Sequence, residues 1–390
     1  MAQYMSPGVY VEEVPSGSAP IAGVGTSTAG FVGLVPDNAA MPTQPSGDPY
    51  VLAPAGQPQL VTNFTEFTTR FGEVAARVDS ASVLGHAVRG YFLNGGTRLW
   101  VVRVASLAVG DTADPVADAL AALETVDEVA LVAAPVKPPD GVDAVRQKAI
   151  RELLLDHCER LQDRFAILDS AEEVAAVTAD AILTVRESTY GAIYFPWIDV
   201  TGNGDYVPPS GHLAGVYGRV DATRGVHKAP ANEVIRGALG LKYRIGKPIQ
   251  DELNPRGVNA LRLFGNSIKV WGARTLKPGD EFTYINIRRL FNFLRESIDE
   301  GLQWAVFEPN TPDLWAKIVR NVSAFLGTVW GSGALFGNTP EQAFYVKCDE
   351  ETNPPNMRDI GAVVTEIGVS VVKPAEFVIF RLSQRAQTGK

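Results

Sequence analysis

The sequence predicts an α/β domain followed by a smaller α+β domain, with an extended strand arm at each end of the chain. Short apolar runs alternate with amphipathic helices through the first two thirds, which is typical of βαβ units and a parallel sheet covered on both faces. Beyond residue 265 the helices lengthen, and strand-forming residues gather at both termini. The predicted divisions are 1–20 for the first arm, 21–265 for the α/β domain, 266–375 for the α+β domain and 376–390 for the second arm.

The first arm is predicted from strand formers that lie between two proline-containing turns at residues 6–8 and 15–17. Proline blocks a helix and favours extended backbone in the residue before it. A single terminal strand leaves its N–H and C=O groups unpaired, so it requires a sheet edge in the same chain or in a neighbouring one. The residues expected to pair in this way are Val9, Tyr10, Val11 and Val14 in the first arm, and Phe377, Ile379 and Phe380 in the second.

The α/β domain is predicted from short strands that alternate with longer helices. Residues 199–232 contain many glycines and prolines and are expected to form loops. Strands are expected at 31–35, 99–104, 129–133, 165–169 and 192–195, and helices within 60–71 and at 82–94, 117–123, 143–161 and 171–185.

The α+β domain contains two helices that each carry one apolar face. The basic residues on their polar sides form either a solvated face or a contact with an acidic partner, and both readings stay open. These residues are Arg288, Arg289, Arg295, Lys317 and Arg320. In order along the chain, we expect a strand at 268–271, helices around 287–298 and 315–326, and strands at 344–348, 360–372 and 376–383.

Composition excludes several function classes. The chain has 390 residues with a net charge of −9, whereas nucleic-acid binders show a basic excess, so no nucleic acid is expected as a partner. No apolar run is long enough to cross a bilayer, and the N-terminus lacks the pattern of a secretory signal, so direct membrane insertion is not expected. Two distant cysteines, Cys158 and Cys348, predict a reducing compartment without disulfides.

Catalytic patterns are weak. The tripeptide Gly25-Thr26-Ser27 is shared with subtilisin-like proteases, but it precedes the α/β region, and a triad needs nucleophile, base and acid together. No G-x-x-x-x-G-K-[ST] phosphate loop is present, and the Gly- and Asn-rich segment 202–205 is expected to be a plain turn. We therefore expect no enzyme, no cofactor and no metal. His157 is expected as a surface imidazole and Cys158 as a core residue.

Several motifs together resemble one known family. They are Tyr4 to Gly17, Ile21-Ala-Gly-Val-Gly-Thr-Ser-Thr-Ala-Gly-Phe-Val-Gly33, Gly218-Arg-Val-Asp221 leading to Gly225-Val-His-Lys-Ala-Pro-Ala-Asn232, Asn254-Pro-Arg-Gly-Val-Asn259, Val270-Trp-Gly-Ala-Arg-Thr-Leu276, Tyr284-Ile-Asn-Ile-Arg-Arg-Leu290 and Trp304-Ala-Val-Phe-Glu-Pro-Asn310. In this order they resemble the contractile tail sheath proteins of myophages, R-type pyocins and extracellular contractile injection systems.

The resemblance implies a subtilisin-like α/β domain without a catalytic triad, a C-terminal domain that faces an inner tube, and arms that join the sheets of neighbouring subunits. It implies a structural subunit that forms a helical homo-oligomer around the tube protein and meets baseplate and tail-terminator or cap proteins. Contraction would then drive the tube through a target envelope. Assembly would be cytoplasmic, with release by lysis. The alternative function is a catalytically active subtilisin-like or other α/β hydrolase.

Overall fold

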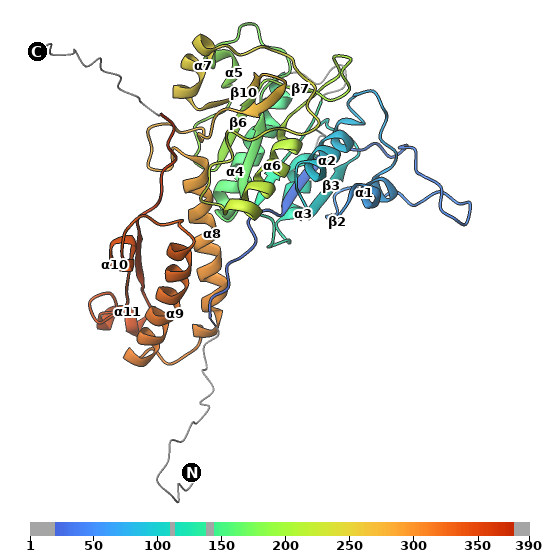
Figure 1. The fold of residues 1–390 in the computed structure, drawn as a ribbon. Helices are drawn as coiled ribbons and strands as arrows, with labels where there is room; N and C mark the ends of the chain where they lie inside the picture. The colour runs from blue at the N-terminus through green and yellow to red at the C-terminus, as the bar shows by residue number, and fades with distance from the viewer. Residues whose placement is uncertain (1–19, 110–113, 138–143, 378–390) are drawn as a thin grey trace, which may run out of the picture.

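The computed structural model describes residues 20–109, 114–137 and 144–377. The chain forms two domains, and one long helix runs from the larger into the smaller (Figure 1). The larger domain is built on an eight-stranded sheet. Its strands, in spatial order, are β11 (Ser267–Val270), β10 (Val258–Phe264), β6 (Gly191–Phe195), β5 (Phe165–Asp169), β4 (Leu131–Ala133), β1 (Ala29–Leu34), β3 (Leu99–Val104) and β2 (Gln59–Val61).

The centre of this sheet is parallel and its two edges are antiparallel. β1 pairs in parallel with both β3 and β4, and the parallel pairing continues through β5 and β6 to β10. β2 and β11 pair antiparallel with β3 and β10. Helical crossovers join the parallel strands, β10 and β11 form a hairpin at one edge, and at the other edge β2 reaches β3 only after α1 and α2.

Helices cover both faces of the large sheet, so its strands are apolar on both sides. In β1, Phe31 faces one core and Val32 the other, because successive side chains of a strand point to opposite faces. One face carries α1 (Phe64–Phe71), α2 (Val83–Leu93) and α6 (Ser210–Arg224). The other carries α3 (Pro115–Leu123), α4 (Ala144–Leu161), α5 (Ala179–Ile182) and α7 (Lys247–Leu253).

Further elements are a three-stranded sheet and two short 3₁₀ helices. The order of the sheet is β8 (Tyr206–Val207), β7 (Ile198–Asp199) and β9 (Gly240–Leu241), and the 3₁₀ turns are η1 (Asn254–Arg256) and η2 (Gln303–Ala305).

The smaller domain packs two long helices against a two-stranded sheet. Leu294 of α8 and Val322 and Leu326 of α9 lie in a separate apolar core. The elements are α8 (Ile285–Leu302), α9 (Pro312–Gly331), α10 (Pro340–Ala343), β12 (Phe344–Lys347), α11 (Pro355–Asp359) and β13 (Glu366–Val369). The strands predicted at 99–104 and 165–169 are confirmed, as are the two long helices of this domain.

The loop predicted over 199–232 is wrong, because it contains the buried helix α6. This helix lies directly against α2, and its glycines serve close packing instead of turns. A Cβ on Gly215 would lie 2.3 Å from the carbonyl oxygen of Tyr91, and one on Gly211 would lie 2.5 Å from Cβ of Ala87. Residues 210–218 of this helix are all buried, so polar and apolar residues do not separate into two faces and its sequence shows no amphipathic period.

Three further predictions need correction. Within 360–372 only Glu366–Val369 forms a strand. Within 171–185 only Ala179–Ile182 is helical. The strand predicted at 268–271 belongs to the large sheet as β11, so the boundary at residue 266 is wrong. The core of the larger domain extends to Leu276 and Ile285, because the β10–β11 hairpin keeps this stretch of chain on the large sheet.

Candidate assembly site

The joint between the two domains is a buried polar cluster centred on Arg289 of α8. Its guanidinium donates to the carboxylate of Asp221 in α6, at 2.5 Å and 3.0 Å, and to the carbonyl oxygen of Thr26 at 2.9 Å. The Thr26 hydroxyl donates to the same carboxylate at 2.7 Å. Arg289 also lies over the ring of Tyr217, whose hydroxyl is 2.6 Å from that of Tyr194. Three separate segments of the chain therefore meet at one ion pair.

Other residues in the first half of α8 hold the same joint through backbone carbonyls. Asn286 donates to the carbonyl oxygen of His227 at 2.8 Å, and Asn292 donates to that of Arg164 at 3.2 Å. Both asparagines are buried. Directional bonds of this kind fix the angle and register of α8 on the larger domain.

The predicted basic face of the second domain divides into two groups. Arg289 is 4% exposed, so it is no surface residue, because Asp221 and Thr26 bind its guanidinium inside the joint. Arg288 stacks over the rings of Tyr190 and Phe282 and donates to Asn292.

The remaining basic residues lie at the surface. Arg295 is exposed and donates to the side chain of Gln162. Lys317 and Arg320 on α9 are both exposed and are the members of the predicted set that stand free of the joint.

The predicted arm residues fall mostly outside the described part of the chain. This holds for Val9, Tyr10, Val11, Val14, Ile379 and Phe380. Phe377 is described and is 71% exposed. Just before it, Glu376 accepts hydrogen bonds from Arg274 at 2.7 Å and 3.1 Å, from Asn254 at 2.6 Å and from Tyr284 at 3.0 Å.

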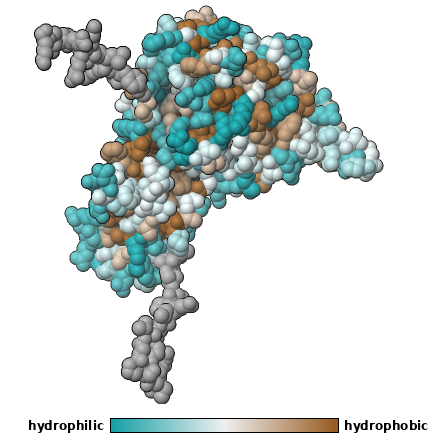
Figure 2. All heavy atoms as spheres, viewed as in Figure 1, coloured by the Kyte–Doolittle hydropathy of each residue, from teal (hydrophilic) through white to brown (hydrophobic). Residues whose placement is uncertain are grey.

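The smaller domain contains a two-stranded sheet, in which β12 and β13 pair from Phe344 opposite Val369 to Lys347 opposite Glu366. Directly after β13, Val371 forms one antiparallel bridge with Leu335. Tyr345 is 58% exposed. Figure 2 shows hydrophobic residues at the surface of this domain between hydrophilic regions. A two-stranded sheet is marginal alone, and its edges present unpaired N–H and C=O groups to a further strand.

Possible catalytic residues do not come together. The Thr26 hydroxyl is bound to Asp221, and among the described residues no histidine side chain makes a hydrogen bond to residues 25–27. The prediction of a surface imidazole at His157 is wrong, because this side chain of α4 is buried with its Nε2 3.3 Å from the Arg164 guanidinium. Burial, with the Arg164 charge, lowers the pKa of His157 to about 4. Cys158 is buried and free, as predicted for a core residue.

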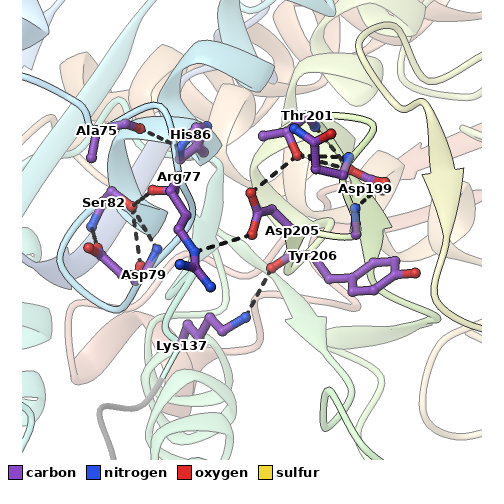
Figure 3. A network of polar contacts seen from close by, with 12 residues as sticks. Ala75, Arg77, Asp79, Ser82, His86, Lys137, Asp199, Thr201, Asp205 and Tyr206 are labelled. Atoms are coloured by element: carbon purple, nitrogen blue, oxygen red, sulfur yellow. Dashed lines mark hydrogen bonds and ion pairs between the residues drawn. The ribbon is translucent and has the colours of Figure 1, made fainter.

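The loop at 202–205 is held by a carboxylate. Figure 3 shows Asp199 facing the loop, where it accepts hydrogen bonds from the backbone N–H groups of Thr201, Gly202 and Gly204 at 3.0, 2.8 and 3.0 Å. These bonds occupy both carboxylate oxygens, and the described residues contain no cluster of three or more metal-ligating side chains. Within the same residues, no helix has the length and apolar character to cross a membrane.

Sequence comparison identifies the family. The profile of the phage tail sheath protein central domain matches residues 110–276, and that of the phage tail sheath C-terminal domain matches residues 277–385. A chain in the helical sheath of the anti-feeding prophage, in its contracted state, is 30% identical with a TM-score of 0.78, over 98% of this chain and all (100%) of that one. The chain belongs to the phage tail sheath family.

Two further sheath relatives define the extent of the similarity. A chain in the anti-feeding prophage baseplate is 31% identical, with a TM-score of 0.78, over 98% of this chain and 100% of that chain. The tail sheath protein of Vibrio phage KVP40 is 27% identical over 178 residues, which cover 44% of this chain and 26% of the phage protein. This sheath chain spans less than half the length of the curated phage relatives that it matches, with shares of 26%, 47% and 38%.

Sequence reasoning missed Asp221 and Glu376 as structural anchors. Asp221 lay within a motif that carried the family resemblance, and no local pattern distinguishes it from the other charged residues of α6, Arg219 and Arg224. Glu376 gave no local signal, because its partners Asn254, Arg274 and Tyr284 are 122, 102 and 92 residues away in sequence.

Proposed function

We propose that this chain is the structural subunit of a contractile sheath and has no enzymatic activity. The observation that carries the proposal is the match over 98% of its length to a chain of a helical sheath, together with a sheet of only two described strands, β12 and β13. A contact that joins different surfaces of identical subunits, without closing a ring, grows into a helix.

The terminal arms would make this contact by strand addition to the β12–β13 sheet of neighbouring subunits. Main-chain hydrogen bonds would supply affinity, and the alternating side chains Val9, Val11 and Phe377 would supply specificity. Each bond contributes about 0.5–1.5 kcal/mol, so one arm holds by a few kcal/mol, less the cost of ordering it. Two arms per subunit, repeated through a lattice, would keep neighbours connected while their faces repack.

A cryo-EM map of polymers formed by the full chain tests strand addition. The proposal predicts a sheet of more than two strands around β12 and β13, with the added strands belonging to other subunits. A map in which both termini fold onto their own subunit would contradict it.

The second domain would face an inner tube through its exposed basic residues, Lys317 and Arg320. Opposite charge on the tube would set register and speed association more than it would add affinity. A variant with both Lys317→Glu and Arg320→Glu should fold normally, since exposed substitutions change stability by about 0.5 kcal/mol or less. It should lose co-assembly with the tube in pull-down. Normal co-assembly would exclude this face, and an Asp313→Asn variant on the exposed start of α9 is the control.

Energy for contraction would be stored in the contacts between subunits, with no nucleotide consumed. The subtilisin-like topology, cytoplasmic assembly and release by lysis belong to the same proposal. Contraction of purified particles in nucleotide-free buffer is expected. A requirement for added ATP would contradict the stored-energy mechanism.

One structural feature, a cleft between the two domains, could favour the competing hydrolase function. A cleft of about 260 Å³ lies beside Arg289, but carboxylates such as Asp127, Glu128 and Glu296 line it, and its lining contains no histidine or cysteine. Burial and the charge of Asp163 raise the pKa of Glu296. We expect no labelling by serine-directed activity probes, and labelling at Ser27 would favour the hydrolase.

A further inference from the structure

The segment that leads to the N-terminal arm is fixed along one face of α8. Residues 21–26, called the strap, run beside α8 in Figure 1. The Val24 N–H donates to Oγ of Ser297 at 3.1 Å, and the Thr26 carbonyl accepts from Arg289. Residues 289, 293, 297 and 301 of α8 are each four apart, which places them in one stripe.

Small residues let the strap lie close to this stripe. A Cβ on Gly301 would lie 2.6 Å from Cγ1 of Ile21, and one on Gly23 would lie 2.9 Å from Cζ of Phe293. Ile21 is itself buried in the core of the smaller domain. The strap therefore begins at the C-terminal end of α8 and runs towards its N-terminal half.

The segment that leads to the C-terminal arm is fixed at the opposite end of the same helix. Glu376 is bound by Tyr284, the residue before the first turn of α8, and by Arg274 and Asn254 of the larger domain. Although burial alone would raise it, the pKa of Glu376 is lowered by the hydrogen bonds from Arg274 and Asn254. The carboxylate stays ionised and its hydrogen bonds are charge-assisted.

We propose that α8 connects the bases of the two arms mechanically and that Glu376 is the residue that fixes the C-terminal arm to it. Tension from a neighbour on one arm would pass along α8 to the other arm. This inference rests on the proposed sheath function, because only in a lattice do both arms carry load. It assigns Glu376 a positioning role that is separate from holding the fold.

The geometry suits this role. A helix of 18 residues is about 27 Å long, and its backbone hydrogen bonds lie nearly parallel to the axis along which the two bases would pull. At the N-terminal end of α8, Asn254 and Arg274 pass part of the load to the larger domain, and at the other end Ile21 anchors the strap in the core of the smaller domain. The contacts of the strap and of Glu376 are the first that tension on the arms would reach.

Optical-tweezers pulling on the single full-length chain, tethered at its first and last residues, tests the inference. The first ruptures should free only the strap and the few residues before Glu376, each as a separate extension of under about 40 Å at roughly 3.5 Å per residue. Unfolding of the smaller domain would instead release about 300 Å. A domain-sized first event in the wild-type chain would overturn the proposal.

Glu376→Gln sharpens the test, because it keeps the shape and removes the charge. The amide keeps one of the two oxygens that accept hydrogen bonds, and each oxygen accepts two of the four bonds, so the force of the rupture that frees Glu376 should fall about twofold while the melting temperature stays close to wild type. Glu376→Ala should lower that force further. Glu350→Gln, at an exposed glutamate after β12, should leave it unchanged. Equal rupture forces for wild type and Glu376→Ala would overturn the role of Glu376. Since the measurement needs no polymer, its outcome is independent of whether the chain forms a sheath.

Discussion

The two halves of α8 are held in different ways. The first half enters the larger domain through buried polar side chains, namely Asn286, Arg289 and Asn292. The second half packs Leu294 and its apolar neighbours against α9. Apolar packing is non-directional, whereas hydrogen bonds and ion pairs need particular positions. The difference shows that the polar contacts at the joint fix the orientation of the smaller domain relative to the larger one. The apolar contacts of the second half contribute mainly to the free energy of unfolding.

Removing the positive charge of Arg289 at the joint should give the largest loss in the free energy of unfolding. Arg289→Met leaves the Asp221 carboxylate buried with one hydroxyl donor, and breaking a buried pair costs about 3–5 kcal/mol. Urea unfolding measures this loss. The double variant Arg289→Met with Asp221→Leu should recover much of it, because no unpaired charge remains. Equal stability of the single and double variants would show that the pair does not organise the joint.

Shortening a side chain in the apolar half of α8 should lower the free energy of unfolding somewhat less. A second substitution in a neighbouring residue should not restore this loss. Leu294→Ala creates a cavity in the smaller core, with an expected loss of about 3 kcal/mol in the free energy of unfolding. Asp299→Ala, at an exposed position on the same helix, is the control and should change stability by under about 0.5 kcal/mol. A loss at Leu294 as small as in the control would contradict the description of this half as a packed core.

As pH falls, the larger domain should lose stability before the smaller one, because all four histidines lie in the larger domain. Burial lowers the pKa of His212 to about 4, and burial with the Arg164 charge does the same for His157. A folded pKa below the unfolded value of about 6.5 means that the unfolded chain binds more protons. The contribution of the two histidines to stability is therefore full above about pH 6.5 and is lost as pH falls towards 4. Asp169 of the same domain, whose pKa burial raises to about 7, offsets part of this loss but not all of it.

Hydrogen exchange followed by mass spectrometry checks this order. Between pH 7.5 and pH 5 each of the two histidines should reduce stability by about 2 kcal/mol. Protection should fall first in α4 and α6, which carry His157 and His212, and later in α9. Simultaneous loss in both domains would indicate that the joint couples them into one unfolding unit.

The smallest effect is expected at the turn that follows α8. Phe307 has a φ of 68° and is fully exposed, in a turn closed by the Glu308 N–H donating to the Ala305 carbonyl oxygen at 3.2 Å. This position of a type II turn favours glycine. Phe307→Gly should raise the free energy of unfolding by up to about 1 kcal/mol, measured by thermal melting, because relief of strain exceeds the added chain entropy. A clear loss would mean that Phe307 packs in the folded chain.

The sequence predicts elements well where one local pattern suffices. The strand at 99–104 and the amphipathic helices α8 and α9 follow from their periodicity. The helix α6 escapes prediction because its residues 210–218 are all buried, and β11 is placed in the wrong domain because the sequence shows no clear strand pattern for its partner β10. The pairing of Asp221 with Arg289 spans 68 residues, and no local rule reveals it.

The arms are the central claim, and deletion of residues 1–17 tests it most directly. The full chain and the truncated chain would each be produced with the tube protein and viewed by negative-stain electron microscopy, with melting temperatures measured in parallel. We predict tubular sheaths from the full chain, and a truncated chain that melts at the same temperature but forms no tubes. Sheaths of normal length from the truncated chain would contradict the account.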